Sequence, residues 1–251
     1  MIKAVKKYSN VVMKRASGSI VYGHDNKKYI DFTSGIGSIS LGYNNKRINY
    51  AIKQQLKKFQ SSQSMCFQNH QNLKLCNTIT SMLPDSIDRT YVTISGSDAV
   101  DSAIRMARYH TGKKIILSMP GGYHGKSLGL AALTENIVDR SRITPFVGSC
   151  FISENILDQI DNSYNNIAAV LIECVKGEGG IYKHDDGFMQ ALRKKCTERG
   201  ILLIVDEIQT FGRTGELFAF QHSNITPDIV VIGKAIGGGL PIASVSASVS
   251  V

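Results

Sequence analysis

A hydrophobic run that ends in lysine decides the fold of this chain: Asp228-Ile229-Val230-Val231-Ile232-Gly233-Lys234, followed by Ala235-Ile236-Gly237-Gly238-Gly239. Its near-continuous apolar residues are typical of a β-strand that is buried on both faces. A second run of the same kind covers 201–207, reads Ile-Leu-Leu-Ile-Val-Asp-Glu and ends in two carboxylates. Such strands belong to parallel sheets that helices cover on both sides, so the two runs predict an α/β fold.

Strand and helix patterns alternate from about residue 70 onward. The predicted strands are 91–94, 114–118, 168–172, 201–206 and 228–232, and the predicted helices are 72–82, 98–110, 186–199 and part of 154–162. This alternation predicts a mainly parallel sheet. Ligands of such sheets bind at the carboxyl ends of the strands, and functional residues are expected there.

The beginning of the chain has a different pattern. It contains in order a predicted β-hairpin, a glycine-bearing loop and a helical stripe, at 19–32, 34–37 and 48–59. We therefore expect two parts, an N-terminal segment over 1–60 and a larger domain over 61–251. Near the other end, 243–251 alternates serine with valine or alanine, a pattern that fits either a strand or a frayed end.

Composition excludes several classes of protein. The net charge of +9 comes from scattered basic residues, so a nucleic-acid-binding protein is not expected. The five cysteines are far apart and form no C-x-x-C pair, which argues against a zinc site or a disulfide framework and favours a reducing compartment. No apolar run reaches the ~18 residues of a membrane span. The first residues lack the apolar region of a signal peptide, and the expected location is the cytoplasm.

A lysine and a carboxylate at the ends of two buried strands are what pyridoxal phosphate requires. The amine of Lys234 would form a Schiff base with the cofactor, and a carboxylate such as Asp206 would pair with the pyridinium nitrogen so that the ring can accept electrons. Asp206 and Glu207 also fit a helix-capping pair or metal ligands. No histidine pair has the spacing of a metal site, so no metal is predicted.

Three loops at predicted strand ends carry further candidates. Gly96 and Ser97 open the helix after strand 91–94, where backbone amides and the helix N-terminus attract anions. Ser97 is thus either a phosphate ligand or only a helix N-cap. Tyr123, in the glycine-flanked loop after strand 114–118, either lies against a planar ring or packs under its loop. The other loop contains Glu173 and Glu178.

A phosphate-binding loop of a nucleoside triphosphatase is the rival interpretation. Gly125-Lys126-Ser127 resembles the end of such a loop, and 203–207 resembles the acidic strand that accompanies it. The spacing requires a glycine where this chain has Pro120, and no apolar helical run follows. No G-x-G-x-x-G follows a predicted strand either, so neither a triphosphatase nor a dinucleotide-binding protein is favoured.

Taken together, these residues resemble the class III (ω-amino) aminotransferases, which depend on pyridoxal phosphate. The resemblance extends from about Ser19 to Ala243. The matching stretches are 31–37 (Asp-Phe-Thr-Ser-Gly-Ile-Gly), 95–100 (Ser-Gly-Ser-Asp-Ala-Val), 122–125 (Gly-Tyr-His-Gly), 173–180, 206–215 (Asp-Glu-Ile-Gln-Thr-Phe-Gly-Arg-Thr-Gly) and 233–241. The 206–215 block and the 233–241 block, in which Lys234 precedes several glycines, are each specific to this family. All of the blocks occur in the family's order.

The resemblance implies roles for named residues. Lys234 and Asp206 would be catalytic, with Lys234 also carrying the proton as general acid and base. The cofactor-binding residues would be Gly96 and Ser97 at the phosphate, Tyr123 and His124 beside the ring, Glu173 in the supporting network, Gln209 at the phenolic oxygen, and Asp206 and Lys234 themselves. Glu178 would face the substrate, and Ile36 would line the entrance within 34–37.

The resemblance also implies the fold and the reaction. The fold would be the large domain of a fold-type-I pyridoxal-phosphate transferase, together with the N-terminal part of a small α+β domain. The reaction would be ping-pong transfer of an amino group from an ω-amino acid or diamine, such as acetylornithine, ornithine or 4-aminobutyrate, to a 2-oxo acid. The family builds its site in a homodimer.

This sequence departs from the family pattern in a few places. Cys174 stands where a proline is usual, Lys176 where a glutamine is usual, and Tyr43 where a histidine is usual. The chain also ends at Val251, so the C-terminal part of the small domain is expected to be absent. The alternative function is therefore a remnant that binds pyridoxal phosphate or a partner subunit without turnover.

Overall fold

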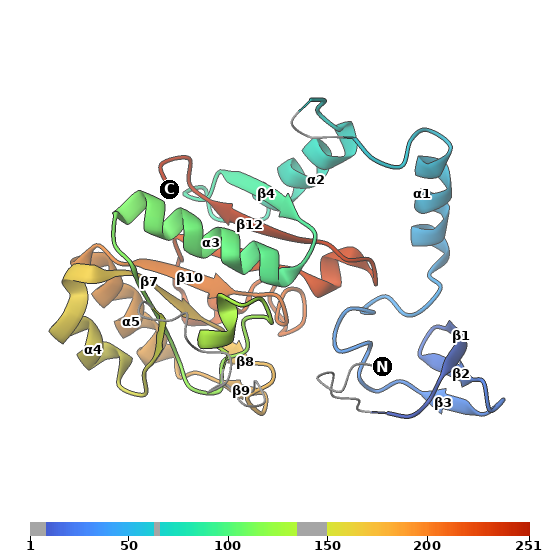
Figure 1. The fold of residues 1–251 in the computed structure, drawn as a ribbon, viewed down its shortest axis with the longest axis horizontal. Helices are drawn as coiled ribbons and strands as arrows, with labels where there is room; N and C mark the ends of the chain where they lie inside the picture. The colour runs from blue at the N-terminus through green and yellow to red at the C-terminus, as the bar shows by residue number, and fades with distance from the viewer. Residues whose placement is uncertain (1–8, 63–65, 135–149) are drawn as a thin grey trace.

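The computed structural model describes residues 9–62, 66–134 and 150–251 (Figure 1). Within these ranges a seven-stranded sheet forms the centre of the molecule. Its strands, in spatial order, are β4 (Arg89–Thr93), β12 (Ala243–Ala247), β11 (Ile229–Ile232), β10 (Leu202–Asp206), β7 (Ile167–Ile172), β5 (Ile115–Ser118) and β6 (Cys150–Ile152). Only β12 runs antiparallel to its neighbours, β4 and β11. The predicted α/β fold with a mainly parallel sheet is confirmed.

The central strands are apolar because helices cover both of their faces. Every residue of β7 and β11 is buried. On one face Val100, Ala103 and Ile104 of α3 (Gly96–Thr111) pack in a cluster with residues of β7, β10 and β11. The other face is covered by residues of α2 (His70–Thr80), α4 (Ile156–Ser163) and α5 (Asp186–Arg199). Figure 1 shows α3 lying across the front of the sheet.

Capping residues fix both ends of α3, the helix whose N-terminus lies at the site. The Ser95 side chain caps α3 by accepting a hydrogen bond from the Asp98 amide at 3.2 Å. Gly112 ends the helix in a left-handed conformation, which glycine adopts without steric cost. The N-terminal end of α3 is therefore placed at the carboxyl end of β4, where backbone amides are available to a ligand.

The tail of the described chain is a strand. Residues 243–247 form β12, which lies between β4 and β11 and is buried throughout. Of the two alternatives left by the alternating serine pattern, the strand is therefore correct and the frayed end is wrong for these residues. Because β12 separates β4 from β11, it sets the distance between the Gly96 loop and Lys234.

The N-terminal segment is a small antiparallel sheet followed by a helix. Its elements are β1 (Met13–Ser17), β2 (Ile20–Gly23), β3 (Lys28–Ile30) and α1 (Lys46–Leu56). The predicted hairpin corresponds to β2 and β3, whereas β1 was not predicted. In Figure 1 these elements lie to one side of the main sheet, and α1 buries none of its residues.

The remaining elements are short. They are the hairpin β8 (Val175–Lys176) and β9 (Tyr182–Lys183) and the 3-10 helices η1 (Leu130–Ala132), η3 (Tyr164–Asn166), η4 (Ala219–Ser223) and η5 (Lys234–Gly237). Across the described residues, none of the helices combines the length and apolar character needed to cross a membrane. The same residues contain no group of three or more metal-binding side chains.

Candidate active site

A cavity of about 190 Å³ lies at the carboxyl ends of the strands. Its lining residues come from the loops after β4, β5, β7, β10 and β11: Ser95, Gly96, Ser97, Tyr123, His124, Gly125, Glu173, Gly177, Glu178, Asp206, Ile208, Gln209 and Lys234. Every predicted site residue except Ile36 is among them. The structure therefore brings together in one place what the sequence spreads over more than a hundred residues.

Asp206 is held in a fixed orientation at the end of β10. His124 Nδ1 lies 2.9 Å from its Oδ2 atom, and both side chains are buried. The amide of Ile208 donates to the other oxygen, Oδ1, at 3.0 Å. These two contacts fix the position of the buried carboxylate.

Glu207, the next residue, points elsewhere. Its Oε1 atom accepts a hydrogen bond from the amide of Phe220 at 3.0 Å, and its Oε2 atom accepts one from the Thr210 hydroxyl. The residue is completely buried, and burial raises the pKa of its carboxyl group. Glu207 therefore organises the turn after β10 and η4, and of the two neighbouring carboxylates only Asp206 lines the cavity.

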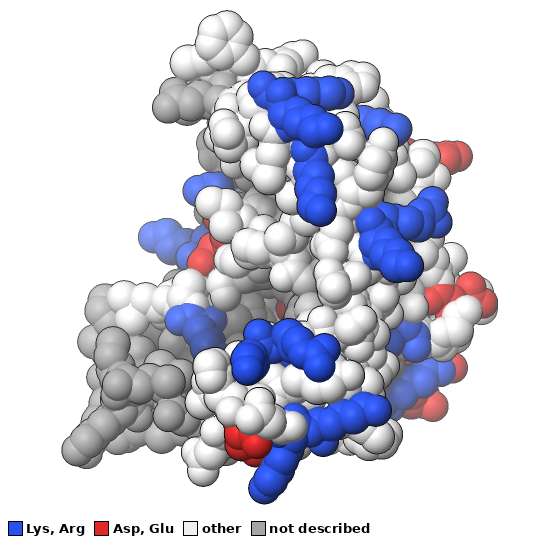
Figure 2. Space-filling model, turned by 90° about the vertical axis from the view of Figure 1, so that its right-hand side faces the viewer, with Lys and Arg blue, Asp and Glu red and all other residues white. Residues whose placement is uncertain are grey.

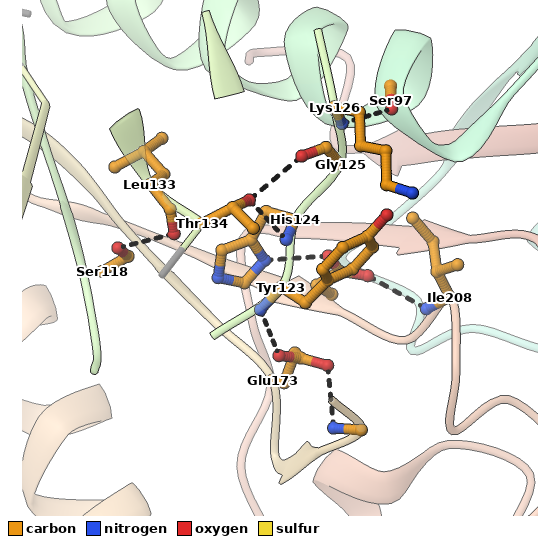
Figure 3. Close-up of polar contacts among 12 residues, drawn as sticks. Ser97, Ser118, Tyr123, His124, Gly125, Lys126, Leu133, Thr134, Glu173 and Ile208 are labelled. Carbon is orange, nitrogen blue, oxygen red and sulfur yellow. Dashed lines mark hydrogen bonds and ion pairs between the residues drawn. The ribbon is translucent and has the colours of Figure 1, made fainter. Parts of the chain in front are cut away.

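Glu173 joins two of the loops around the cavity. Its carboxylate accepts hydrogen bonds from the amide of Tyr123 at 2.9 Å and from the amide of Gly177 at 3.1 Å (Figure 3). Burial raises the pKa of Glu173, and the nearby charge of Asp206 raises it further. The contacts are made to backbone atoms, so the Glu173 side chain positions the loop that contains Tyr123 relative to the loop after β7.

Lys234 follows β11 after a single residue, Gly233, and begins η5. Its φ of +42° lies in the left-handed region, which is uncommon for a residue with a side chain and is concentrated at functional sites. Burial lowers the pKa of its amine, while the charges of Asp206 and Glu173 act in the opposite direction. The result is an amine that is more readily deprotonated than that of an exposed lysine, as a nucleophilic lysine requires.

The Ser97 hydroxyl is not the cap of α3, because the Ser95 side chain caps the helix. The Ser97 Oγ atom instead accepts a hydrogen bond from the amide of Lys126 at 3.2 Å, which joins the start of α3 to the loop after β5. The N-cap alternative for Ser97 is thus wrong. A hydroxyl that lines the cavity beside a helix N-terminus remains suited to binding an anion.

The loop after β5 is not the phosphate-binding loop of a triphosphatase. Residues 121–129 contain no helix, whereas such a loop leads directly into one. Instead, the Thr134 side chain fixes the backbone of this loop at His124 and Gly125. Its hydroxyl accepts a hydrogen bond from the His124 amide and donates one to the carbonyl of Gly125, both at 3.1 Å (Figure 3). Thr134 is buried, and nothing in the sequence pattern singled it out.

Gly125 lies where only glycine fits. Its φ is +128°, and a Cβ atom there would approach Ser97 Oγ to 2.4 Å and Leu130 Cδ1 to 2.8 Å. We expect Gly125→Ala to lower the free energy of unfolding by roughly 2–4 kcal/mol, from backbone strain and overpacking together. Urea denaturation measures this loss.

The matched control for Gly125→Ala is Gly112→Ala. Gly112 also has a positive φ, +67°, but no atom lies within 4 Å of the added Cβ. Gly112→Ala should lower the free energy of unfolding by about 1 kcal/mol. Equal losses at the two positions would contradict the close packing of Gly125 against Ser97.

Ile208 is a site residue that the sequence analysis missed. It lines the cavity together with Tyr123. A Cβ atom on Gly96 would come within 2.7 Å of Ile208 Cδ1, so the isoleucine packs directly against the start of α3. The chain turns directly after Asp206, so no strand periodicity in the sequence pointed to Ile208.

A second cavity, of about 1070 Å³, opens between the N-terminal segment and the larger domain. It shares the lining residues Gly177, Glu178 and Gln209 with the first cavity, so the two cavities adjoin at these residues. Ile36 lines only the second cavity, with a positive φ of +54°. Figure 2, which faces the N-terminal segment, shows a hollow near the middle of this surface. The predicted entrance residue therefore lies at the outer cavity.

Comparisons with known proteins show the family. The model of the class-III aminotransferase family matches residues 2–251. The chain is 36% identical over 248 residues to a [LysW]-aminoadipate semialdehyde/glutamate semialdehyde transaminase of Sulfolobus acidocaldarius, covering 97% of this chain and 64% of the relative. It is 34% identical over 235 residues to an acetylornithine aminotransferase of Archaeoglobus fulgidus, covering 92% and 62%. The chain belongs to the class III aminotransferases.

Comparison with solved structures agrees with this family assignment. The structure of the ornithine aminotransferase of Toxoplasma gondii, which contains pyridoxal phosphate at partial occupancy, matches with a TM-score of 0.90 and 25% sequence identity. The match covers 99% of this chain and 61% of that one. The fold is thus that of a fold-type-I aminotransferase. The chain spans about three fifths of the length of the relatives that it matches.

The cofactor of this family is pyridoxal phosphate, and the residues of the cavity fit it. A partly buried amine at Lys234, a buried carboxylate at Asp206 and the N-terminus of α3 supply the three groups that its aldehyde, ring nitrogen and phosphate require. The Oε1 atom of Gln209 is buried without a hydrogen-bond partner among the described residues. A buried polar atom of this kind at a cavity is suited to a ligand.

Proposed function

We propose that the protein transfers an amino group from a primary amine to a 2-oxo acid with pyridoxal phosphate as cofactor. The observation that carries this proposal is the convergence of Lys234 and the His124-supported Asp206 in one cavity at the ends of neighbouring strands. Family membership supports the reaction type. The chain spans only part of its relatives, so the activity is a proposal for this molecule.

In this proposal the protein positions the cofactor and moves protons, and the cofactor supplies an electron sink for the carbon atom that gains or loses the amino group. The Lys234 amine binds the cofactor and then carries a proton between reacting atoms. Asp206 holds a proton on the ring nitrogen, and His124 keeps the carboxylate aimed at it. The two catalytic roles thus fall on the partly buried Lys234 amine and the buried Asp206 carboxylate.

The remaining residues bind and orient the cofactor. Gly96 and Ser97 receive the phosphate at the start of α3, and Tyr123 lies against the ring with Ile208 as the other apolar side chain at the cavity. Gln209 binds the phenolic oxygen. Glu173 contributes through its two backbone contacts, which hold the Tyr123 loop in place.

We propose that the amino donors of this protein are ω-amino acids or diamines. The relatives are named for aminoadipate semialdehyde, glutamate semialdehyde and acetylornithine, all of them carriers of a terminal nitrogen or aldehyde. Glu178 and Ile36 face the outer cavity through which such a substrate would enter. We further propose a homodimer located in the cytoplasm, on the family resemblance and on the five free cysteines.

The proposal is tested by incubating the chain, pyridoxal phosphate and 2-oxoglutarate with acetylornithine, ornithine and 4-aminobutyrate in turn. Glutamate formation measures transfer. Transfer from at least one terminal amine, equal in wild type and Lys183→Ala, is the expected result; Lys183 is an exposed lysine that pairs with Asp186. Cofactor bound at Lys234 without glutamate from any donor would overturn the enzymatic proposal and favour a binding protein without turnover.

Attachment of pyridoxal phosphate to Lys234 is expected to accelerate with rising pH, with a midpoint below the usual lysine pKa. Only the unprotonated amine has a lone pair for bond formation, and burial lowers the pKa of Lys234. The reactive fraction near neutral pH is therefore larger than for an exposed lysine. Stopped-flow absorbance across the neutral and alkaline range measures the midpoint, with Nα-acetyl-lysine, whose side-chain amine is free, as reference. A midpoint at or above that of Nα-acetyl-lysine would contradict the lowered pKa of Lys234.

A further inference from the structure

The guanidinium of Arg213 joins two segments that are far apart in the sequence. Its Nε atom donates a hydrogen bond to the carbonyl of Gln209 at 2.7 Å. Its Nη2 atom donates to the carbonyl of Gly37 and to the hydroxyl of Ser40, the latter at 3.2 Å. One side chain thus connects the turn after β10 with the loop that follows β3.

The side chain of Gln209 is closely packed beside this contact. A Cβ atom on Gly37 would meet the Oε1 atom of Gln209 at 2.3 Å and the Nη2 atom of Arg213 at 3.0 Å. A Cβ atom on Gly177 would meet the Cγ atom of Gln209 at 2.9 Å. The Gln209 side chain therefore fits between two glycine backbones, and its position depends on how closely the Gly37 loop approaches.

The Gly37 loop has an internal structure of its own. The Asp31 carboxylate accepts hydrogen bonds from the amides of Thr33 at 2.8 Å and Gly35 at 2.9 Å, and from the hydroxyl of Tyr43 at 2.9 Å. The Thr33 hydroxyl also donates to it, and this bond is the main cause that lowers the pKa of Asp31 to about 2. Arg213 therefore binds a preorganised loop, and its contact determines where the whole loop lies.

We propose that Arg213 is a positioning residue: it holds the Gly37 loop against Gln209 and so fixes the Gln209 amide at the point where the two cavities meet. The inference rests on the proposed function, in which Gln209 binds the phenolic oxygen of the cofactor. Arginine suits this role because its rigid fork reaches both carbonyls at once. A lysine has a single charged atom at its end and cannot make the Nε and Nη2 contacts together.

The first test is a double-mutant cycle on cofactor binding. Pyridoxal phosphate is titrated into wild type, Arg213→Gln, Gln209→Ala and the double variant, with affinity and the cofactor's absorbance maximum as readouts. Arg213→Gln is expected to weaken binding about tenfold and to shift the absorbance maximum as Gln209→Ala does, since both remove the same hydrogen bond. Arg213→Lys should not restore either readout.

In the double variant, the Arg213 substitution should have no further effect, because its effect passes through Gln209. Additive losses would overturn the inference, and so would an Arg213→Gln variant that binds pyridoxal phosphate with wild-type affinity and absorbance. Each readout is independent of turnover.

The second test needs no cofactor. Amide hydrogen exchange over residues 33–40 should increase in Arg213→Gln relative to wild type. The matched control is Arg193→Gln. This substitution breaks the ion pair in which Arg193 Nη1 lies 2.6 Å from Oδ2 of Asp228, the residue that precedes β11. This control should leave exchange in residues 33–40 unchanged. Unchanged exchange in Arg213→Gln would overturn the proposed contact.

The two tests separate the inference from the proposed function. If wild type fails to attach the cofactor at Lys234, the proposed function fails, and the exchange measurement still decides whether Arg213 holds the loop. If wild type attaches the cofactor but the Arg213 variants behave like it, the positioning role fails and the function stands.

Discussion

Replacing Lys234 with alanine is expected to lower the rate of amino transfer by about 10⁴-fold and to abolish covalent attachment of pyridoxal phosphate. The substitution removes both the nucleophile that binds the cofactor and the base that carries the proton, and proton transfer alone contributes ~10²–10⁴-fold in enzymes. No other lysine lines the cavity among the described residues. Initial rates of glutamate formation, measured with the donor that wild type accepts, give the size of the loss.

Two controls show whether the loss comes from the amine. Lys183→Ala removes an exposed lysine and should keep the wild-type rate. Lys234→Gly also lacks the amine, but glycine tolerates the φ of +42°, so it should be inactive and yet about 1 kcal/mol more stable than Lys234→Ala. An alanine variant that retains a tenth or more of the wild-type rate would contradict the role of Lys234.

Replacing Asp206 with asparagine is expected to lower the transfer rate by about 10²–10³-fold. The amide has the same shape but carries no negative charge, so it cannot hold a proton on the ring nitrogen, and unpairing a buried charge costs ~3–5 kcal/mol. His124 Nδ1 and the Ile208 amide are placed to bind a carboxylate, and one of these contacts faces the NH₂ group in the variant. Rates and the absorbance spectrum of the bound cofactor measure the change.

The adjacent carboxylate provides the matched control. Glu207 is also buried, but it binds Thr210 and Phe220 and does not line the cavity. Glu207→Gln should therefore lower the free energy of unfolding while changing the transfer rate by no more than a few-fold. The assignment of the two carboxylates is wrong if Glu207→Gln loses activity and Asp206→Asn keeps it.

The centre of the fold was predictable because its signals are local. The residues of β7, β10 and β11 are apolar on both faces, so each strand could be recognised alone, and a parallel sheet follows from the helices between them. The candidate site was predictable for the same reason. Its polar residues stand directly after such strands, and the carboxyl ends of parallel strands meet at one edge.

Contacts between distant segments were not predictable. The position of β12 between β4 and β11 depends on pairing across more than half the chain, and its alternating sequence fits a strand or a frayed end equally well. β1 is short, mostly exposed and defined by its partner β2. Arg213 could be quoted as part of a motif, but its contact with Gly37 exists only in the folded molecule.

Side chains without a distinctive chemistry were also missed. Ile208 is one apolar residue among many, and only the cavity shows that it lies beside Tyr123. Thr134 acts through a hydroxyl that hydrogen-bonds the backbone, a role that no spacing rule marks. Ser95 and Ser97 are both good helix caps by residue type, so the choice between them required the observed hydrogen bond from Asp98 to Ser95.

The attachment site of the cofactor tests the central claim most directly. Purified protein is mixed with pyridoxal phosphate, treated with borohydride to fix the cofactor on the amine to which it has bonded, digested and mapped by mass spectrometry. We expect one modified peptide, with the label on Lys234. A protein that develops no cofactor absorbance, or a label distributed over exposed lysines such as Lys183 and Lys194, would contradict the assignment of this cavity as a pyridoxal-phosphate site.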